Sequence, residues 1–269
     1  AACSGHLHLV KWLWEKGIRS DHRGAQSAAG NGHLVTLKWL HKQDIWCTTR
    51  GADDAAVYGD LVILKWLDKQ DIRCSFLGAN YAAEGGHLET LKWLHEQHED
   101  YITSHTTAYA ASGGHFEILK WIHQQGIRCD AYTAHNAVLR GHMEILKWLH
   151  QQNIKCDAKD ANTAACFGHF EILQWLHQQD IRCNAEGAND AARHGHLEVL
   201  QWLFEQGIWC DVDGARYAAR RGWMQVLELL HEQEIRLDTA NDAAFGGQWE
   251  TLQWLHQQDI RCDAEGAND

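Results

Sequence analysis

Apolar and polar positions along the chain follow one pattern that repeats about every 27 residues. The pattern is marked by tryptophans at Trp12, Trp39, Trp66, Trp93, Trp121, Trp148, Trp175, Trp202 and Trp254. Seven residues before most of them stands a glycine, in the series Gly5, Gly32, Gly59, Gly86, Gly114, Gly141, Gly168, Gly195, Gly222 and Gly247. Leu229 takes the place of the one missing tryptophan. Such a register is typical of an array of stacked repeats.

Each unit contains two apolar segments, which predict a helical hairpin. In the unit 187–213 we expect the second helix from His196 to about Gln206, after Gly195 ends the first helix. Its apolar positions are Leu197, Val199, Leu200, Trp202 and Leu203. They spread around the helix over an arc much wider than the roughly 100° of a surface helix. This helix is therefore expected to pack on its own first helix and on the second helices of both neighbours.

The first helix of this unit is predicted to be short, around Asn189–His194, and to bury the small residues Ala188, Ala191 and Ala192. Small side chains let helices approach closely but fill little volume. Most of the hydrophobic stabilisation is therefore expected from the Leu and Trp side chains of the second helices.

The run AAxxGHLExLxWL, present as Ala191 to Leu203, resembles the centre of the ankyrin repeat, and a form of it recurs across nearly the whole chain. The resemblance implies an all-α solenoid of about ten ankyrin-like helix-turn-helix repeats. It departs from the family in two respects, because ankyrin units have about 33 residues and carry a Thr-Pro-Leu-His signature that is absent here. The missing residues fall where ankyrins build β-hairpin fingers, so we expect shortened finger loops. The short, Trp-bearing form most resembles ankyrin arrays encoded by amoebae, oomycetes and large viruses that infect amoebae.

The whole chain, residues 1–269, is interpreted as one repeat array without a second domain. Its expected units are 1–23, 24–50, 51–77, 78–105, 106–132, 133–159, 160–186, 187–213, 214–238 and 239–265, with the start of another at 266–269. An extra residue is expected to bulge the loop 99–102, and a deletion is expected to tighten the loop 237–239. Neither end carries the polar cap that solenoids need. The expectation is an excerpt from a longer array, or ends that stack on something else.

Near the position of the family's signature histidine stand Asn162, Asn189, Asn241 and His135. The resemblance implies that these side chains supply the hydrogen bonds that bridge the backbones of neighbouring repeats.

The charge of the chain argues against several kinds of partner. Its 36 acidic and 24 basic residues give a formal net charge of −12, which opposes binding to nucleic-acid phosphates and to an anionic membrane surface. No apolar run approaches the roughly 18 to 20 residues of a membrane span. We expect neither nucleic acid nor membrane as a partner.

Seven cysteines share one repeat position: Cys47, Cys74, Cys129, Cys156, Cys183, Cys210 and Cys262. Equivalent atoms of adjacent repeats should lie roughly 8 to 10 Å apart, whereas a disulfide needs Cα atoms within about 7 Å. We therefore expect reduced thiols buried as small apolar residues, with a metal ladder as the alternative. Reduced thiols favour the cytoplasm or nucleus, which means the host-cell cytoplasm if the source is a virus or pathogen.

The histidines and glutamates recur like the structural residues. Fourteen of the 20 histidines occupy two repeat positions, one opening the second helix and one following its Trp-Leu pair. Within one helix the two lie eight residues apart, too far for the i,i+4 pairing of a zinc helix. We expect helix-end and surface roles for them, and helix capping for Glu198 and its equivalents. An enzyme needs one asymmetric set of groups in a pocket, so we expect no catalytic residues, no cofactor and no metal.

Candidate recognition residues lie where the pattern varies around the Ala-Ala pair of the first helix. They are Tyr81, Tyr109, Asn136, Arg140, Thr163, Phe167, Asp190, Arg193, Tyr217, Arg220 and Arg221. Tyr and Arg often anchor protein interfaces, and the resemblance implies that partners meet the concave face formed by first helices and loops. Trp46 and Trp209, which replace the usual Arg between the loop Ile and Cys, should point outward and also suggest contact.

Two functional interpretations remain open at this point. The first is a scaffold or adaptor that binds a protein partner through the concave face and loops. The second is a structural protein whose ends join into filaments by continuing the same packing.

Overall fold

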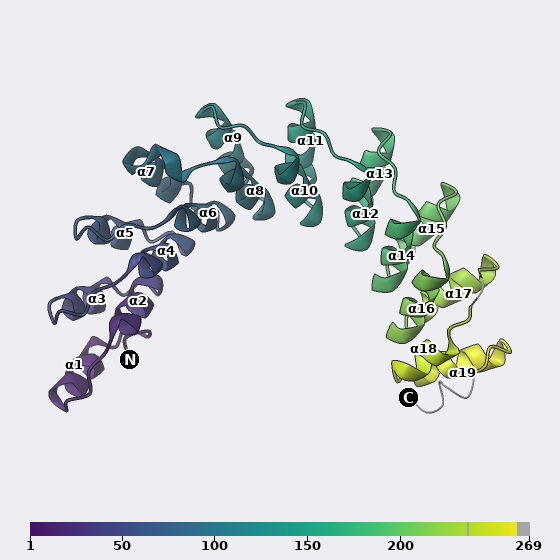
Figure 1. Cartoon of the computed structure of the whole chain (residues 1–269), viewed down its shortest axis with the longest axis horizontal. Coiled ribbons are helices and arrows are strands. Elements are labelled where there is room, and N and C mark those ends of the chain that lie inside the picture. The colour runs from purple at the N-terminus through teal and green to yellow at the C-terminus, as the bar shows by residue number, and fades with distance from the viewer. Residues whose placement is uncertain (236, 263–269) are drawn as a thin grey trace. The chain divides into compact units, whose positions relative to one another are not determined.

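A computed structural model describes residues 1–235 and 237–262 of the chain (Figure 1). In these residues the secondary structure is helical throughout, with no β-strand, which confirms the predicted all-α class. The expected start of a further unit at 266–269 lies outside the described residues. None of the described helices is both long and apolar enough to cross a membrane.

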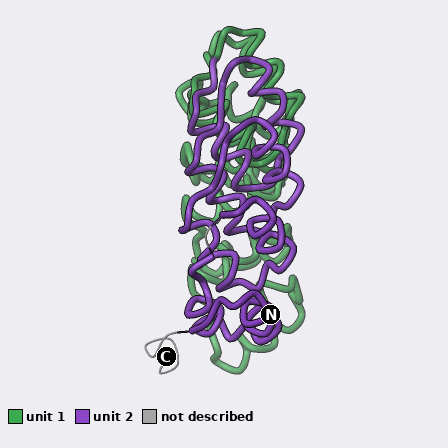
Figure 2. The backbone as a smooth tube through the Cα atoms, turned by 90° about the vertical axis from the view of Figure 1, so that its right-hand side faces the viewer, with its two compact units in different colours: residues 1–154 green, residues 155–269 purple. Residues whose placement is uncertain are grey.

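The chain divides into two compact units, residues 1–154 and residues 155–269 (Figure 2). The helices of the first unit are α1 (Leu7–Glu15), α2 (His22–Gly30), α3 (Leu34–His41), α4 (Thr49–Val57), α5 (Leu61–Asp68), α6 (Phe76–Glu84), α7 (Leu88–Gln97), the 3₁₀ turn η1 (Glu99–Tyr101), α8 (Ser104–Ser112), α9 (Phe116–Gln124), α10 (Ala131–Leu139) and α11 (Met143–Gln151). Those of the second unit are α12 (Ala158–Cys166), α13 (Phe170–Gln178), α14 (Ala185–His194), α15 (Leu197–Glu205), α16 (Val212–Arg221), α17 (Met224–Glu232), α18 (Ala240–Phe245) and α19 (Trp249–Gln257).

Within each unit the helices form two layers (Figure 1). The even-numbered helices from α2 to α10, and from α12 to α18, are the first helices of the repeats, and consecutive ones pack side by side. The odd-numbered helices are the second helices and form the other layer. The closest approach between repeats is made by first helices, because paired alanines such as Ala191 and Ala192, both 0% exposed, allow the backbones to come together.

The second helices contribute aliphatic side chains to the core, and their tryptophans lie at its margin. In α15, Leu200 and Leu203 are 0% exposed, whereas Trp202 is half-buried. The expected contribution of leucine is confirmed, whereas the tryptophan of this helix is buried less completely than expected. The Trp202 ring contacts the rings of Phe170 and His177 on α13, the preceding second helix. The largest fully buried side chains are Leu and Ile, and the alanines of the first helices are also buried.

The first helices are longer than the sequence pattern indicated. α14 spans Ala185–His194 and begins four residues before the predicted start at Asn189. Its N-cap is Asn184, whose side chain accepts a hydrogen bond from the Glu186 backbone N–H at 3.0 Å. The first turn buries no large apolar residue, so hydrophobic periodicity could not mark it. The helix ends as predicted at Gly195, with φ 78°.

The two loops of irregular length, at 99–102 and 237–239, differ in structure from the equivalent loops of the other repeats. Residues Glu99–Tyr101 form the 3₁₀ turn η1, so the extra residue is accommodated by a bulge, as predicted. In the second unit α18 has only six residues, while the other first helices have nine or ten. The deletion before it thus removes the first turn of this helix.

Candidate protein-binding surface

The histidine that opens most of the second helices links neighbouring repeats. His196 Nε2–H donates a hydrogen bond to the Cys166 carbonyl at 3.0 Å. The equivalent bonds, at 2.8 to 3.1 Å, are His33 to Cys3, His87 to Val57, His115 to Glu84 and His142 to Ser112. Trp223 takes the histidine position in a later repeat, and its indole N–H donates to the Arg193 carbonyl at 3.1 Å. These side chains are therefore bridges between repeats and do not cap their own helices.

In some repeats a second bridge joins the first helix to the start of the next one. Asn162 Oδ1 accepts a hydrogen bond from the Asn184 N–H at 3.1 Å, and Asn189 Oδ1 accepts one from the Asp211 N–H at 2.8 Å. For Asn162 and Asn189 the predicted bridging role is confirmed. His135 and Asn241 occupy equivalent positions on α10 and α18.

The histidine after each Trp-Leu pair also belongs to the stack. Its ring lies edge-on against the tryptophan of the next repeat, with centroids 5.1 to 5.7 Å apart for His41–Trp66, His95–Trp121, His123–Trp148, His177–Trp202 and His231–Trp254. Nδ1 of His41, His95 and His177 is buried. The three rings are half-buried, so besides the predicted helix-end and surface role they pack on the neighbouring indole.

The cysteine ladder is largely buried, as predicted for a small apolar residue. Cys47, Cys74, Cys183 and Cys210 are each 5% exposed, whereas Cys262 is exposed. Burial raises the pKa of Cys74 and of Cys183 to about 12, because an apolar environment disfavours the thiolate. Near neutral pH these thiols are protonated and therefore weak nucleophiles and weak metal ligands. Among the described residues no group of three or more His, Cys, Asp or Glu side chains could hold a metal ion.

Variable side chains on the first helices meet across neighbouring repeats. Tyr81 on α6 is 38% exposed and packs edge-on against the half-buried Tyr109 on α8, with centroids 5.8 Å apart. In the second unit the Arg193 guanidinium on α14 lies 3.9 Å from the ring centroid of Tyr217 on α16. Asp190 lies 3.8 Å from Arg193. We call the outward side of the first helices, with these two pairs, the first-helix face.

The other candidate residues on this face differ in how far their side chains are exposed and free to contact a partner. Asn136 and Thr163 bond back to their own helices, through the carbonyls of Tyr132 at 2.8 Å and Lys159 at 2.9 Å. The exposed candidates are Arg140, Phe167, Arg220 and Arg221. Arg220 lies over the Phe245 ring at 4.4 Å and pairs with Asp242 at 3.3 Å, so its guanidinium is fixed in place.

Several exposed residues of this face were missed by the sequence analysis. Tyr58, Tyr132 and Phe245 are 69%, 57% and 61% exposed. Tyr58 and Phe245 stand at the variable positions directly after the Ala-Ala pair, so a complete listing of those positions would have found them. Arg216 on α16 pairs with Asp242 on α18 at 2.9 Å. The spacing of residues along the sequence did not indicate this contact between adjacent repeats.

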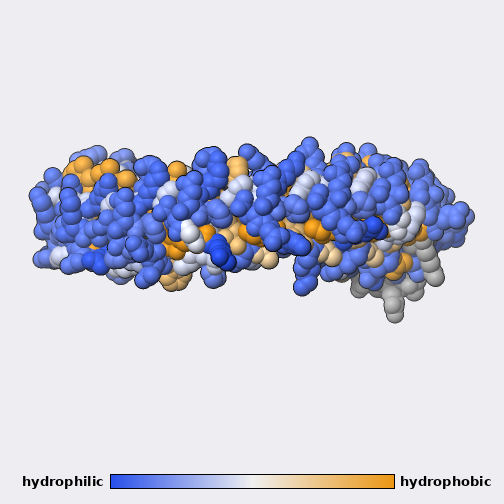
Figure 3. Space-filling model, turned by 90° about the horizontal axis from the view of Figure 1, so that it is seen from above, coloured by the Kyte–Doolittle hydropathy of each residue, from blue (hydrophilic) through white to orange (hydrophobic). Residues whose placement is uncertain are grey.

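Trp46 and Trp209 lie in loops after second helices and are 50% and 45% exposed, so they point outward as predicted. Each packs on an aromatic ring of its own repeat. Trp46 lies 4.2 Å from His41, and Trp209 stacks on Phe204 at 4.8 Å. Away from these sites, apolar side chains appear in small groups among polar ones (Figure 3).

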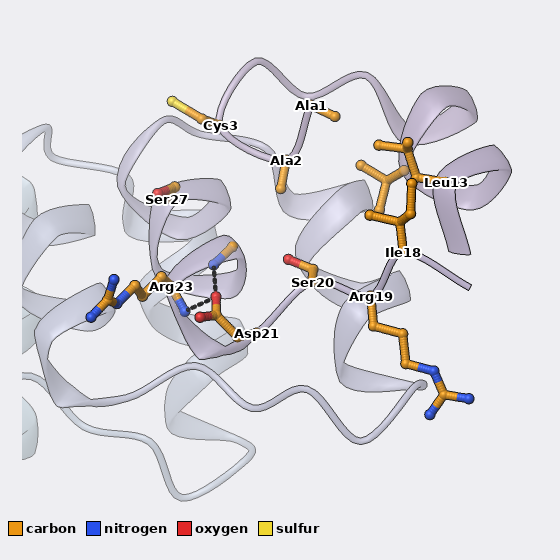
Figure 4. A pocket seen from close by; sticks show the side chains of 12 residues that line it. Ala1, Ala2, Cys3, Leu13, Ile18, Arg19, Ser20, Asp21, Arg23 and Ser27 are labelled. Carbon is orange, nitrogen blue, oxygen red and sulfur yellow. Dashed lines mark hydrogen bonds between the residues drawn. The ribbon is translucent and has the colours of Figure 1, made fainter. Parts of the chain in front are cut away.

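An open hollow of about 510 Å³ lies at the first repeat (Figure 4). Apolar side chains of Val10, Leu13 and Ile18 line it on one side. Asp21 lies on the other side, where its carboxylate accepts hydrogen bonds from the Arg23 and Gly24 N–H groups and caps α2.

Two family models for ankyrin repeats match the chain, one described as many copies over residues 108–150 and one as three copies over residues 134–215. The chain contains ankyrin repeats, which the models match over residues 108–215. Its fold is similar to the human ASB11 ankyrin repeat domain, with TM-score 0.54 and 19% identity over 69% of this chain and 99% of that one. It is also similar to the pentatricopeptide repeat protein PPR10 in complex with an 18-nt psaJ RNA element, with TM-score 0.51 and 12% identity over 99% of this chain and 49% of that one. No curated protein matches.

Ankyrin repeats are in general modules of protein–protein interaction and are typically not catalytic. At the identities above, the likeness to solved structures concerns the fold alone.

Proposed function

We propose that this ankyrin array is a non-catalytic scaffold or adaptor that binds a protein partner through the first-helix face and the adjoining loops. The observation that carries the proposal is the division between recurring and variable residues. The recurring His, Asn, Cys and Ala side chains are engaged in stacking the repeats. The variable side chains Tyr81 and Tyr217 are exposed, and they are preordered by contacts with the half-buried Tyr109 and Arg193. Aromatic and Arg side chains fixed in this way lose little entropy on binding.

A capture experiment with matched variants tests this proposal. The double variants Y81A/Y109A and R193A/Y217A should each weaken binding of the captured partner by about 30-fold, the effect of losing an anchor worth roughly 2 kcal/mol. Val62→Ala, which alters a 65% exposed side chain on the second-helix layer, is the control and should bind normally. Affinity that is unchanged in both double variants would remove the first-helix face from consideration.

We further propose residence in the cytoplasm or nucleus. The protonated, buried thiols of the cysteine ladder suit a reducing compartment, where disulfides are rare. Microscopy of the tagged chain in host cells tests this, and secretion into the medium would contradict it.

End-to-end self-association is the second candidate, favoured by the apolar surface at the first repeat. Leu9 is 37% and Trp12 is 52% exposed there. Light scattering at rising concentration distinguishes the two functions, since filaments grow with concentration and an adaptor keeps one mass. The variant Trp12→Gln should abolish growth if this end forms the contact.

A further inference from the structure

The rings on the second-helix layer form a ladder that runs from repeat to repeat. In the second unit the ring of His177 meets Trp202 at 5.1 Å, and that of His231 meets Trp254 at 5.7 Å, both edge-on. At the first repeat Trp14 replaces the histidine and meets Trp39 in the same geometry, at 5.6 Å. In these repeats an aromatic edge on one repeat meets an indole on the next, and the first partner can be His or Trp. On α5 the position of the first partner is taken by Asp68.

Between α15 and α17 the ladder lacks its indole. The edge partner is present as Phe204, but Leu229 stands where the other repeats have tryptophan. An open hollow of about 380 Å³ lies at this point, lined by Phe204 and Leu229 and by the polar side chains of Gln201, Glu205 and Gln233. We call it the Leu229 hollow. If position 229 were a tryptophan, its indole would lie between these lining residues of α15 and α17.

The first unit shows the same local arrangement with the indole in place. There the loop residue Trp46 packs on His41 at 4.2 Å, and His41 meets Trp66 of the next repeat at 5.3 Å, which makes a row of three rings. In the second unit Trp209 packs on Phe204 at 4.8 Å, and the row ends there after two rings. The Leu229 hollow occupies the place of the third ring.

We propose that the Leu229 hollow receives the indole of a tryptophan side chain from a partner protein. Phe204 and Leu229 are 7% and 9% exposed and form an apolar base, which an aromatic ring covers with an edge-to-face contact. Gln201 and Glu205 at the rim offer oxygen acceptors to the indole N–H. The Glu205 carboxylate at the rim would repel an acidic side chain, whereas it can accept a hydrogen bond from the neutral N–H of an indole. The site lies on the second-helix layer and does not depend on the proposed role of the first-helix face.

Fluorine NMR with two small probes tests the proposal. The probes are free 5-fluoroindole and the capped peptide acetyl-Gly-(5-fluorotryptophan)-Gly-amide, so that a free indole and a backbone-borne indole are compared. Leu229→Trp fills the hollow from α17, and Gln201→Trp covers it from α15 at an exposed position that folding tolerates. Glu228→Ala, an exposed change on α17 outside the lining, is the matched control.

The peptide is expected to bind the wild type and the Glu228→Ala variant equally. Its affinity should fall at least about tenfold in Leu229→Trp and in Gln201→Trp, because the hollow is already occupied. Equal affinity for the wild type and a folded filling variant overturns the proposal. So does binding of free 5-fluoroindole without binding of the peptide, because the hollow then excludes a side chain attached to a backbone.

Discussion

At the residue scale, the structure shows that one contact can be made by different side chains when they present the same chemical group. His196 and Trp223 occupy equivalent positions, and both donate a ring N–H to a carbonyl at the end of the preceding first helix, at 3.0 and 3.1 Å. A tryptophan can therefore replace a histidine here without loss of the hydrogen bond, because both present a ring N–H of suitable reach.

The pH dependence of stability tests the state of His196. Burial lowers its pKa below the ordinary 6.5, although its hydrogen bond to Cys166 opposes that shift. Below about pH 6.5 the unfolded chain binds more protons at this residue than the folded chain does. The free energy of unfolding therefore decreases as the pH is lowered, until the pH is below the folded-state pKa of His196. Gln retains an N–H donor but does not titrate. His196→Gln should therefore lose less stability than the wild type in urea unfolding between about pH 7.5 and about pH 5.5. Parallel losses in both proteins would refute this account of His196.

The cysteines should differ sharply in reactivity. Cys3 and Cys262 are exposed, whereas Cys74 is buried and its pKa is raised to about 12. Since the thiolate is the reactive form, iodoacetamide should modify Cys3 and Cys262 first and reach Cys74 only after the chain unfolds. Peptide mapping by mass spectrometry follows each site, and comparable early labelling of Cys74 would contradict its burial.

At the element scale, the sequence predicted the second helices better than the first. The second helix expected from His196 to about Gln206 is α15, Leu197–Glu205, because its Leu and Val positions mark the helical period. The first turn of α14 carries Ala185, Glu186 and Gly187, which give no such signal. Its start is fixed by the Asn184 side chain, which caps the helix by accepting a hydrogen bond from the Glu186 N–H. The period of apolar residues does not reveal such a cap.

Two glycines with left-handed backbones separate conformational strain from packing. Gly195 has φ 78°, and a Cβ there would lie 2.6 Å from the Trp223 ring. Gly207 has φ 75° with nothing within 4 Å. Gly207→Ala should cost roughly 1 to 2 kcal/mol of unfolding free energy from the backbone alone. Gly195→Ala should cost about 1 to 3 kcal/mol more, because Trp223 has to move. Equal losses in chemical denaturation would show that the bridge from Trp223 adjusts freely.

At the scale of the whole molecule, stability within each unit comes from contacts between adjacent repeats. The order of the repeats and the exposure of Tyr81, Trp46 and Trp209 could be predicted from the sequence, because they follow from the period and its departures. The pairing of Arg193 with Tyr217 could not. It depends on the offset between successive first helices, which the period does not specify. The Leu229 hollow likewise appears only when the ring contacts of neighbouring repeats are known.

The central claim is that recurring residues hold the repeats together, while variable residues of the first-helix face bind the partner protein. Hydrogen exchange of the chain with and without its captured partner tests this claim most directly. Binding should slow exchange in peptides that cover α6 and α8, around Tyr81 and Tyr109, or α14 and α16, around Arg193 and Tyr217. Protection confined to the second helices, with the first helices unchanged, would contradict the claim.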